Sequence, residues 1–357
     1  MGMRGRLGEL CHRSGMLRML QRVRQWGRHD LRILAYHRVL TLAERSHFDF
    51  DLDLVSASAE GFREQMLLLK RHFRPISLTA VATAAVAGQP LPPDAVVVTF
   101  DDGYDDNYRV AYPILRELGI PATFFVSTGY IDSGLPYDYD WLVHMILRAP
   151  AERVAIPELS LELAPGAGRD ARRRLAGEAL SRIKMLDGEA QTALMKRLER
   201  DWGMPRGGGH PDCRPMSWKQ LREMHAAGFE IGSHGVHHRM LAKLSQQELE
   251  FELCESKAVL ERQLGVPATT ISYPVGGDSA FDDRVVDAAI TAGYQVGCSY
   301  ICGTNALAQL QRHALYRLPV ERMMGLGWFD AMLTLPEWLS YPTSRTSTEA
   351  ARTECSP

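Results

Sequence analysis

The chain has 357 residues, of which 45% are hydrophobic and 24% are charged, and its formal net charge at pH 7 is -2. This composition is typical of a globular protein that can bury one large core or two modest ones. The near-neutral charge argues against a nucleic-acid partner, which would favour a basic excess. The six cysteines are scattered along the chain, and we interpret them as reduced thiols, which favours a reducing compartment.

Residues 1–30 form a basic segment in which arginines alternate with apolar residues, and its only acidic residues are Glu9 and Asp30. The segment lacks the apolar core and cleavage site of a signal peptide, which predicts a cytoplasmic location. No run in the chain is long enough to span a membrane. A helix packed on its own domain is the favoured interpretation. The alternative is a basic amphipathic helix in peripheral contact with an anionic membrane.

Two elements follow the basic segment. Residues 31–39 are an apolar run that predicts the first buried strand, and this run contains Tyr36 and His37 near its end. Residues 58–73 carry apolar residues at helical spacing, with Ser58 in position to cap the helix. By itself, a histidine at a strand end is more often packed or exposed than catalytic.

The central strand is predicted at residues 96–100, where a β-branched run stops at Asp101, Asp102 and Gly103. Adjacent carboxylates on an extended chain point to opposite sides, so one could hold a metal while the other takes a proton. Considered alone, the Asp-Asp-Gly motif fits an ordinary turn equally well.

The pattern between residues 131 and 215 differs from the rest. Two helices are predicted there, at 175–186 and 193–202, among segments rich in Pro, Gly and Arg. We interpret 131–215 as a helical insertion. Three aromatic residues at its start could stack on a ring-shaped ligand, although burial is the commoner fate of such residues: Tyr137, Tyr139 and Trp141.

Strands and helices alternate again after residue 216, which predicts a mostly parallel sheet closed or nearly closed as a barrel. Ser245 and Glu248 form a capping-box pattern that opens a long helix ending at Gly265. The last strand is predicted at 315–320. The composition of residues 336–357 predicts a disordered tail.

A second polar cluster follows the strand at 229–232. His234 and His238 are four residues apart, so one helical turn or a tight loop would place both imidazoles on one face. Two imidazoles and one carboxylate are a common ligand set for a catalytic zinc ion. The cluster therefore strengthens the functional interpretation of Asp101 and Asp102.

Together, Thr-Phe-Asp-Asp-Gly at 99–103 and His-Gly-Val-His-His at 234–238 resemble the motifs of polysaccharide deacetylases of the NodB homology type, carbohydrate esterase family 4. The resemblance covers roughly residues 31–325. It implies a distorted (β/α) barrel, here with a helical insertion, at residues 31–335. Tyr36-His37 resembles the Tyr-His pair that is found at this position in one branch of the family, the deacetylases that act on poly-N-acetylglucosamine-like exopolysaccharides.

The family resemblance also implies roles for individual residues. A divalent metal, with zinc as the first choice, would be held by Asp102, His234 and His238, and it would activate a water molecule. Asp101 would be the base that takes the proton of this water. His37 would be the acid that protonates the departing sugar amine.

The third motif of the family departs from its usual form. The family carries Arg-x-Pro-Tyr where this chain has Ser-Tyr-Pro-Val at 272–275, so the usual arginine partner of the catalytic Asp is missing. Arg317 could take over that role, or it could pair with a surface carboxylate; the two have equal weight. Substrate or oxyanion contacts are expected from Val275, Tyr104 and Tyr273.

The expected substrate is an N-acetylated oligo- or polysaccharide, or its precursor, from which acetyl groups are removed. An amidase acting on a non-sugar C–N bond is an alternative, because a fold does not fix its substrate. A non-catalytic carbohydrate-binding protein of the same fold is another. The presence of both carboxylates, both histidines and Tyr36-His37 argues against the binder.

Overall fold

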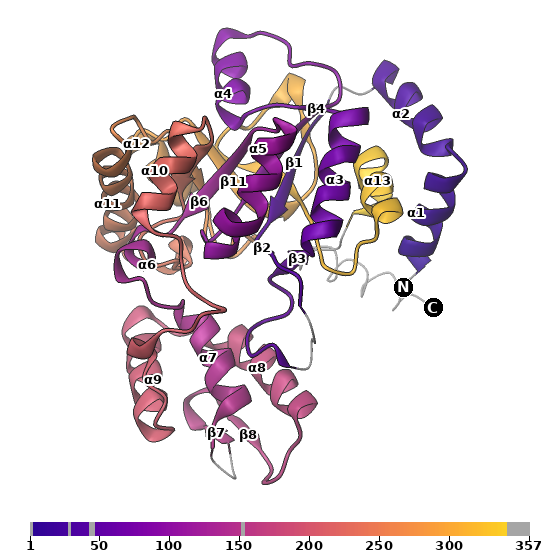
Figure 1. Ribbon diagram of the computed structural model, residues 1–357. Helices are drawn as coiled ribbons and strands as arrows, with labels where there is room; N and C mark the ends of the chain where they lie inside the picture. The colour runs from indigo at the N-terminus through magenta and orange to yellow at the C-terminus, as the bar shows by residue number, and fades with distance from the viewer. Residues whose placement is uncertain (1–2, 28–29, 43–46, 151–153, 341–357) are drawn as a thin grey trace, which may run out of the picture. The chain divides into compact units, whose positions relative to one another are not determined.

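The structure is a computed structural model that describes residues 3–27, 30–42, 47–150 and 154–340. The chain forms two compact units (Figure 1). Unit 2 comprises Leu42–Asp53 and Tyr130–Pro215, and unit 1 comprises the rest of the chain. The insertion expected at 131–215 thus corresponds to most of unit 2. Unit 2 also takes a segment from before the central strand, which the sequence pattern did not indicate.

Unit 1 is built on a closed ring of parallel strands. Around the ring the order is β1-β13-β11-β10-β9-β6-β5, and pairing of β5 with β1 closes it. Among the described residues the ring has seven strands, so the predicted (β/α) barrel is confirmed. The ring strands are β1 Asp30–Tyr36, β5 Ala95–Phe100, β6 Ala122–Val126, β9 Glu230–Ser233, β10 Thr270–Ser272, β11 Val296–Cys302 and β13 Leu315–Pro319.

Short strands flank the ring. β4 (Arg74–Pro75) extends the sheet beside β5, and β12 (Asn305–Ala306) pairs antiparallel with β1. A separate parallel pair joins β2 (Arg38–Val39) to β3 (Val55–Ala57).

Side chains along each ring strand point alternately into the barrel and to its outer face. Val97 clusters with apolar side chains of β1, β6, β11 and β13, and such a cluster can form only inside a closed ring. Phe100, three residues on, instead stacks on Phe124 at 4.7 Å and packs against Phe62 of helix α3. Thr99 and Asp101 share the inner side with Val97, because side chains alternate with a period of two.

Helices surround the barrel (Figure 1). Ser58, Ser217 and Ser245 each cap a helix, and the last two form complete capping boxes, so the capping box predicted at Ser245 and Glu248 is confirmed. None of the described helices is both long and apolar enough to cross a bilayer. The helices are α3 Ala59–His72, α4 Leu78–Ala87, η2 Asn107–Ala111, α5 Tyr112–Leu118, α6 Thr128–Ser133, α10 Trp218–Ala226, η5 Leu241–Lys243, α11 Gln246–Leu264, α12 Asp283–Thr291, η6 Leu307–Gln309, α13 Leu326–Thr334 and α14 Pro336–Leu339.

The N-terminal segment folds as two helices, α1 (Met3–Arg13) and α2 (Met16–Gly27), which lie beside α13 in Figure 1. Side chains at Gly8 and Gly327 would collide with the facing helix: a Cβ at Gly8 would come within 2.8 Å of the Trp328 Cα atom. Backbone-to-backbone packing of α1 on α13 therefore depends on these two glycines.

The chain remains ordered beyond the domain boundary expected at residue 335. Helix α14 occupies Pro336–Leu339, and Leu339 is buried against Cys11 and Leu17. The rest of the expected tail, residues 341–357, lies outside the described residues.

Unit 2 has its own apolar core. Its helices α7, α8 and α9 pack around a short antiparallel hairpin of β7 and β8. Tyr137 and Trp141 are buried, so they are core residues. The elements are α7 Asp138–Arg148, β7 Val154–Ile156, η3 Pro157–Leu159, β8 Leu161–Leu163, α8 Arg169–Ile183, α9 Gly188–Asp201 and η4 Arg206–Gly208.

Candidate metal and catalytic site

The candidate site lies at the carboxyl ends of the ring strands, all within unit 1. Tyr36 of β1 is in register with Phe100 of β5, so His37 and Asp101 leave neighbouring strands at the same level. Val126 of β6 pairs with Ser233 of β9, which places the histidine loop at the same edge. Parallel barrels gather functional side chains at this edge because the strand ends meet there.

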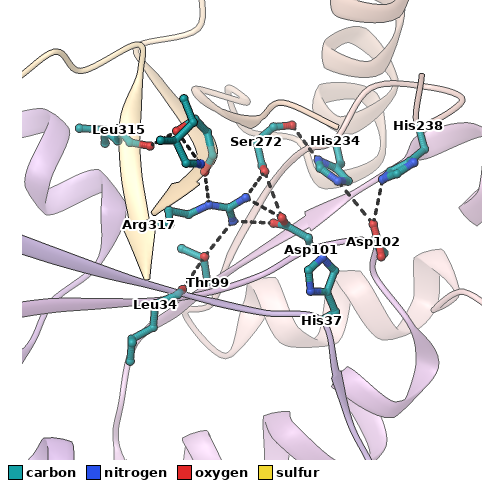
Figure 2. Close-up of polar contacts among 12 residues, drawn as sticks. Leu34, His37, Thr99, Asp101, Asp102, His234, His238, Ser272, Leu315 and Arg317 are labelled. Atoms are coloured by element: carbon teal, nitrogen blue, oxygen red, sulfur yellow. Dashed lines mark hydrogen bonds and ion pairs between the residues drawn. The ribbon is translucent and has the colours of Figure 1, made fainter. Parts of the chain in front are cut away.

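Asp102, His234 and His238 form a compact group with metal-ligand character (Figure 2). The Nε2 atoms of His234 and His238 lie 3.4 and 3.2 Å from the same carboxylate oxygen, Oδ1 of Asp102. Asp102 and His234 are almost fully buried, while 13% of the His238 side chain is exposed. The group is thus reachable from one side only, as a catalytic metal site with an open position requires.

The hydrogen bonds of His234 test whether a cation fits this group. Its Nδ1 atom lies 2.7 Å from the carbonyl oxygen of Ser272. A carbonyl only accepts, so Nδ1 carries the proton, and in the neutral ring the Nε2 lone pair then faces the Asp102 carboxylate. Two acceptors in contact need a proton or a metal cation between them. The arrangement of one carboxylate and two imidazoles therefore fits a divalent metal.

The pKa values reflect the same arrangement. Burial would raise the pKa of Asp102, yet the imidazoles of His234 and His238 beside it hold that pKa well below its ordinary value. Burial lowers the pKa of His234, but the carboxylates of Asp101 and Asp102 outweigh burial and raise it. The site is therefore a concentrated negative charge that favours a bound cation.

The loop that carries the histidines is held by Glu252 of helix α11. Its Oε2 atom accepts from the backbone N–H groups of Val236 (2.7 Å) and His237 (2.9 Å), and its Oε1 lies 2.7 Å from Nδ1 of His237. This pairing turns the ring of His237 towards Glu252, whereas His234 and His238 face Asp102. Glu252 escaped the sequence interpretation, since nothing in its helix marks it as functional.

Asp101 lies beside the metal group and pairs with Arg317 of β13 (Figure 2). The guanidinium donates to both carboxylate oxygens, at 2.8 and 2.6 Å. Arg317 is fully buried, so it does not pair with a surface carboxylate. Burial alone would raise the pKa of Asp101. The positive charges of Arg317 and His234 outweigh burial and lower this pKa below its ordinary value, so Asp101 is held ionised.

The remaining donors of Arg317 are all used. Its Nη2 donates to Oγ of Ser272 at 2.9 Å, its Nη1 to Oγ1 of Thr99 at 3.2 Å, and its Nε to the carbonyl oxygen of Ser299 at 2.6 Å. A guanidinium held at five points has one orientation, and this fixes the plane of the Asp101 carboxylate. Ser272 is a further member of the site that the sequence did not reveal.

His37 sits at the start of the loop after β1, close to Asp101 (Figure 2). Its backbone N–H donates to Oγ of Ser56 at 3.0 Å, and its carbonyl accepts from Nδ2 of Asn107 at 2.7 Å. Its ring makes an edge contact with Tyr300, with centroids 5.3 Å apart. Three residues thus hold His37, whose imidazole is still partly exposed.

Two of the five non-glycine residues with positive φ among the described residues are in the carboxylate–histidine group, Asp102 (71°) and His238 (55°). A third, Val275 (64°), follows strand β10. Positive φ is costly for a β-branched residue such as Val275, and strained backbone of this kind concentrates at functional sites. The strain at Val275 supports the expected use of its backbone.

Tyr104 and Tyr273 are placed differently from the expected substrate contacts. Both side chains are fully buried. Arg38 lies over the Tyr104 ring, 4.5 Å from its centroid, and the Tyr273 hydroxyl donates to the carbonyl of His313 at 2.8 Å. Tyr273 also packs with apolar residues of α11 and α12, so neither tyrosine is exposed for direct contact with a substrate.

A second carboxylate–histidine group, Asp49, His144 and His210, lies in unit 2. Here both oxygens of Asp49 accept from arginines, Arg148 and Arg169, at 2.6 Å each. Two neighbouring cations disfavour a metal ion at this carboxylate. We therefore interpret this group as an ion-paired part of the unit 2 core.

Comparison with known proteins gives matches along most of the chain. A family model described as polysaccharide deacetylase matches residues 88–297. YxkH of Bacillus subtilis (strain 168), which carries a provisional name as a polysaccharide deacetylase, is 24% identical over 238 residues, which are 67% of this chain and 56% of that protein. The poly-β-1,6-N-acetyl-D-glucosamine N-deacetylase of Escherichia coli (strain K12) is 30% identical over 109 residues, which are 30% of this chain and 15% of that enzyme. The chain thus aligns with about half of the first relative and a small part of the second.

Among solved structures, the Streptococcus pyogenes deacetylase PplD in complex with acetate matches 88% of this chain and 100% of its own, with a TM-score of 0.57 at 19% identity. Likeness at this identity shows a common fold. The region matched by the family model contains Asp101, Asp102, His234, His238 and Val275, while His37 and Arg317 lie outside it.

Proposed function

Because the chain belongs to the polysaccharide deacetylase family, we propose that it hydrolyses N-acetyl groups from amino sugars of a polysaccharide or its precursor. One observation carries the proposal: an arginine-held carboxylate, Asp101, stands directly beside the group formed by Asp102, His234 and His238. Amide hydrolysis needs a base and an electrophilic centre next to each other, and this arrangement supplies positions for both.

Asp102, His234 and His238 would hold a divalent metal, with zinc as the first choice because the donor set is two imidazoles and one carboxylate. A zinc ion at such a site lowers the pKa of a water molecule to roughly 7 and polarises a carbonyl group. The chain's own contribution is orientation. The hydrogen bond from His234 to Ser272 fixes which imidazole nitrogen faces the cation.

Asp101 accepts the proton of the attacking water. Arg317 and Ser272 both donate to Oδ2 of Asp101, and Arg317 also donates to Oδ1, which keeps the carboxylate plane fixed and leaves Oδ1 a second lone pair that can accept. The new bond forms between the water oxygen and the acetyl carbon. The backbone N–H of Val275 donates to the oxyanion that develops there.

His37 protonates the sugar nitrogen as the C–N bond breaks, so that acetate and a free amine leave. Its partly exposed ring lies near Asp101, and its backbone is anchored by Ser56 and Asn107.

The substrate class is inferred from the relatives. One relative, at 30% identity, is named for its action on poly-β-1,6-N-acetyl-D-glucosamine. We infer that this chain acts on a polymer or precursor of N-acetylated amino sugars of the same chemical type.

The test is release of acetate from N-acetylglucosamine oligomers by purified, zinc-loaded protein. Asp101→Asn is expected to reduce turnover by about 10²–10⁴-fold and to keep bound zinc, because Asp101 is no ligand. The double variant Asp102→Ala, His234→Ala is expected to lose both turnover and bound zinc. No release despite stoichiometric bound zinc would overturn the substrate assignment and favour another amide. Absence of metal binding would favour a non-catalytic protein.

A further inference from the structure

We propose that the outer face of helices α1 and α2 docks on a membrane surface rich in anionic lipid. We call this surface the α1–α2 face, and we define it by its exposed apolar residues Leu7, Leu10, Met16, Met19, Val23 and Trp26 and its exposed arginines Arg6, Arg13 and Arg22. The inference concerns attachment and does not depend on the proposed deacetylase activity.

The inner side of the two helices is fully engaged with unit 1. Cys11 and Leu17 are buried against Ala331 and Leu339. Arg18 pairs with Asp330, which is itself buried. The helices are therefore a folded part of unit 1, and their exposed apolar residues do not result from poor packing.

The outer side of α2 carries a stripe of apolar side chains at helical spacing. Met19 is 60% exposed, Val23 64% and Trp26 91%. Residues 19, 23 and 26 follow one another at i+4 and i+3, so they lie on one line along the helix, and Leu10 of α1 is 66% exposed as well. A helix that buries one face in protein and presents a second apolar face outward has an unsatisfied surface.

The charge of helices α1 and α2 indicates which kind of partner binds this surface. Helices α1 and α2 contain six arginines and a single acidic residue, Glu9, although the whole chain has a net charge of -2. Arg24 is neutralised on the inner side by Asp30 and Glu337. Arg6 and Arg22 are exposed, whereas Arg13, whose side chain is 77% exposed, pairs with Glu9 at 2.8 Å. The positive charge that remains therefore borders the apolar stripe.

Apolar side chains flanked by arginines are the features of helices that lie in a lipid interface. The apolar residues enter the boundary between headgroups and acyl chains, and each arginine is attracted to anionic headgroups. Trp26, at the end of the stripe, has an amphipathic indole that favours this depth. A second copy of the chain fits less well, because a two-fold interface would bring the same arginines against each other.

The experiment is co-sedimentation of the full chain with vesicles of phosphatidylcholine alone and with vesicles that also contain the anionic lipid phosphatidylglycerol. We expect binding to the anionic vesicles that weakens with salt. Val23→Ser with Trp26→Ser, and separately Arg6→Glu with Arg22→Glu, should each reduce partitioning by about tenfold or more. The matched control is Val86→Ser with Met185→Ser, two residues exposed to a similar extent elsewhere.

Three results would overturn the proposal. One is no binding to anionic vesicles by the native chain. Another is equal binding by the native chain and both double variants, with circular dichroism showing that all are folded. A third is a dimer in gel filtration that Val23→Ser with Trp26→Ser dissociates, since the surface would then belong to a second copy.

Discussion

At the scale of single residues, the site contains a buried ion pair, and either charge would be destabilising without its partner. Arg317 is fully buried and satisfies both oxygens of Asp101, which is also buried. Replacing a buried ion pair as a whole can be neutral, but removing one partner leaves an uncompensated charge in the interior. The pair therefore has a structural role as well as the proposed catalytic one.

Arg317→Met should lower the free energy of unfolding by about 3–5 kcal/mol, because Asp101 then remains buried without its partner. Adding Asp101→Asn should recover part of the loss, since no charge is left. Denaturant unfolding of both variants measures this. Arg63→Met is the matched control: Arg63 makes an equally short pair with Glu117, but both side chains are well exposed, so its effect should be much smaller. Equal losses for the two arginine variants would contradict the argument.

The residues that could be predicted from the sequence are those carried by short local motifs. Asp101, Asp102, His234 and His238 stand in two compact clusters at strand ends, and the structure brings them together. Ser272 reaches Asp101 across 171 residues, and no local pattern marks such a contact. Tyr104 and Tyr273 lie next to motifs in sequence yet point into the core, because neighbours on a chain face different sides.

At the scale of elements, the histidine loop depends on helix α11. Glu252 is buried, and hydrogen bonds from His237 and the loop backbone outweigh burial and keep its pKa below the ordinary value. An ionised carboxylate that accepts three hydrogen bonds holds the loop in place. Gly235, at φ 74°, gives the loop its turn, and a Cβ there would approach the Glu252 carboxylate to 2.9 Å.

Glu252→Ala should weaken metal binding by about 10–100-fold, because His234 and His238 lose the support that orients them. Competition with a chelator measures the affinity directly, without reference to turnover. Activity should return at saturating metal, since Glu252 contacts neither metal nor substrate. Glu250→Ala, an exposed position on the same helix, is the control. Unchanged affinity in Glu252→Ala would show that the loop holds its shape without the carboxylate.

Helix starts were the most predictable elements, because a cap needs only residues three apart. Ser58 and the Ser245–Glu248 capping box open helices where expected. The π-helix at Asn107–Ala111 was not foreseen, since its apolar residues fit an ordinary helix. It places the Asn107 side chain against the carbonyl of His37, so an unforeseen element supports a foreseen residue.

At the scale of the whole molecule, strand–helix alternation was enough to predict a parallel barrel, but not its order. Closure depends on the pairing of β1 with β5, two strands separated by the helices α3 and α4. Likewise, Leu42–Asp53 joins unit 2 through contacts such as that of Asp49 with Arg148, which are 99 residues apart. Such contacts are set by tertiary packing and leave no periodic signal. The expected cytoplasmic location stays a prediction.

Acid should destabilise unit 2, because this unit buries a histidine in neutral form. Burial, and then the neighbouring His210, lowers the pKa of His144 to about 4, with Arg148 acting in the same direction and Asp49 opposing it. Phe50 and Trp141 stack on its ring. Between pH 6.5 and 4 the unfolded chain therefore binds a proton at His144 that the folded chain does not bind, so stability falls as pH falls.

His144→Phe keeps the aromatic stacking and removes the titrating group. The thermal midpoint of the native chain should drop more between pH 7 and pH 5 than that of His144→Phe, because the variant lacks this proton uptake on unfolding. Calorimetry at several pH values measures both. His313→Phe is a weaker comparison in unit 1, since burial also lowers the pKa of that histidine. Parallel pH curves for native and His144→Phe protein would contradict the argument, because they would mean that His144 binds its proton equally well in the folded and the unfolded chain.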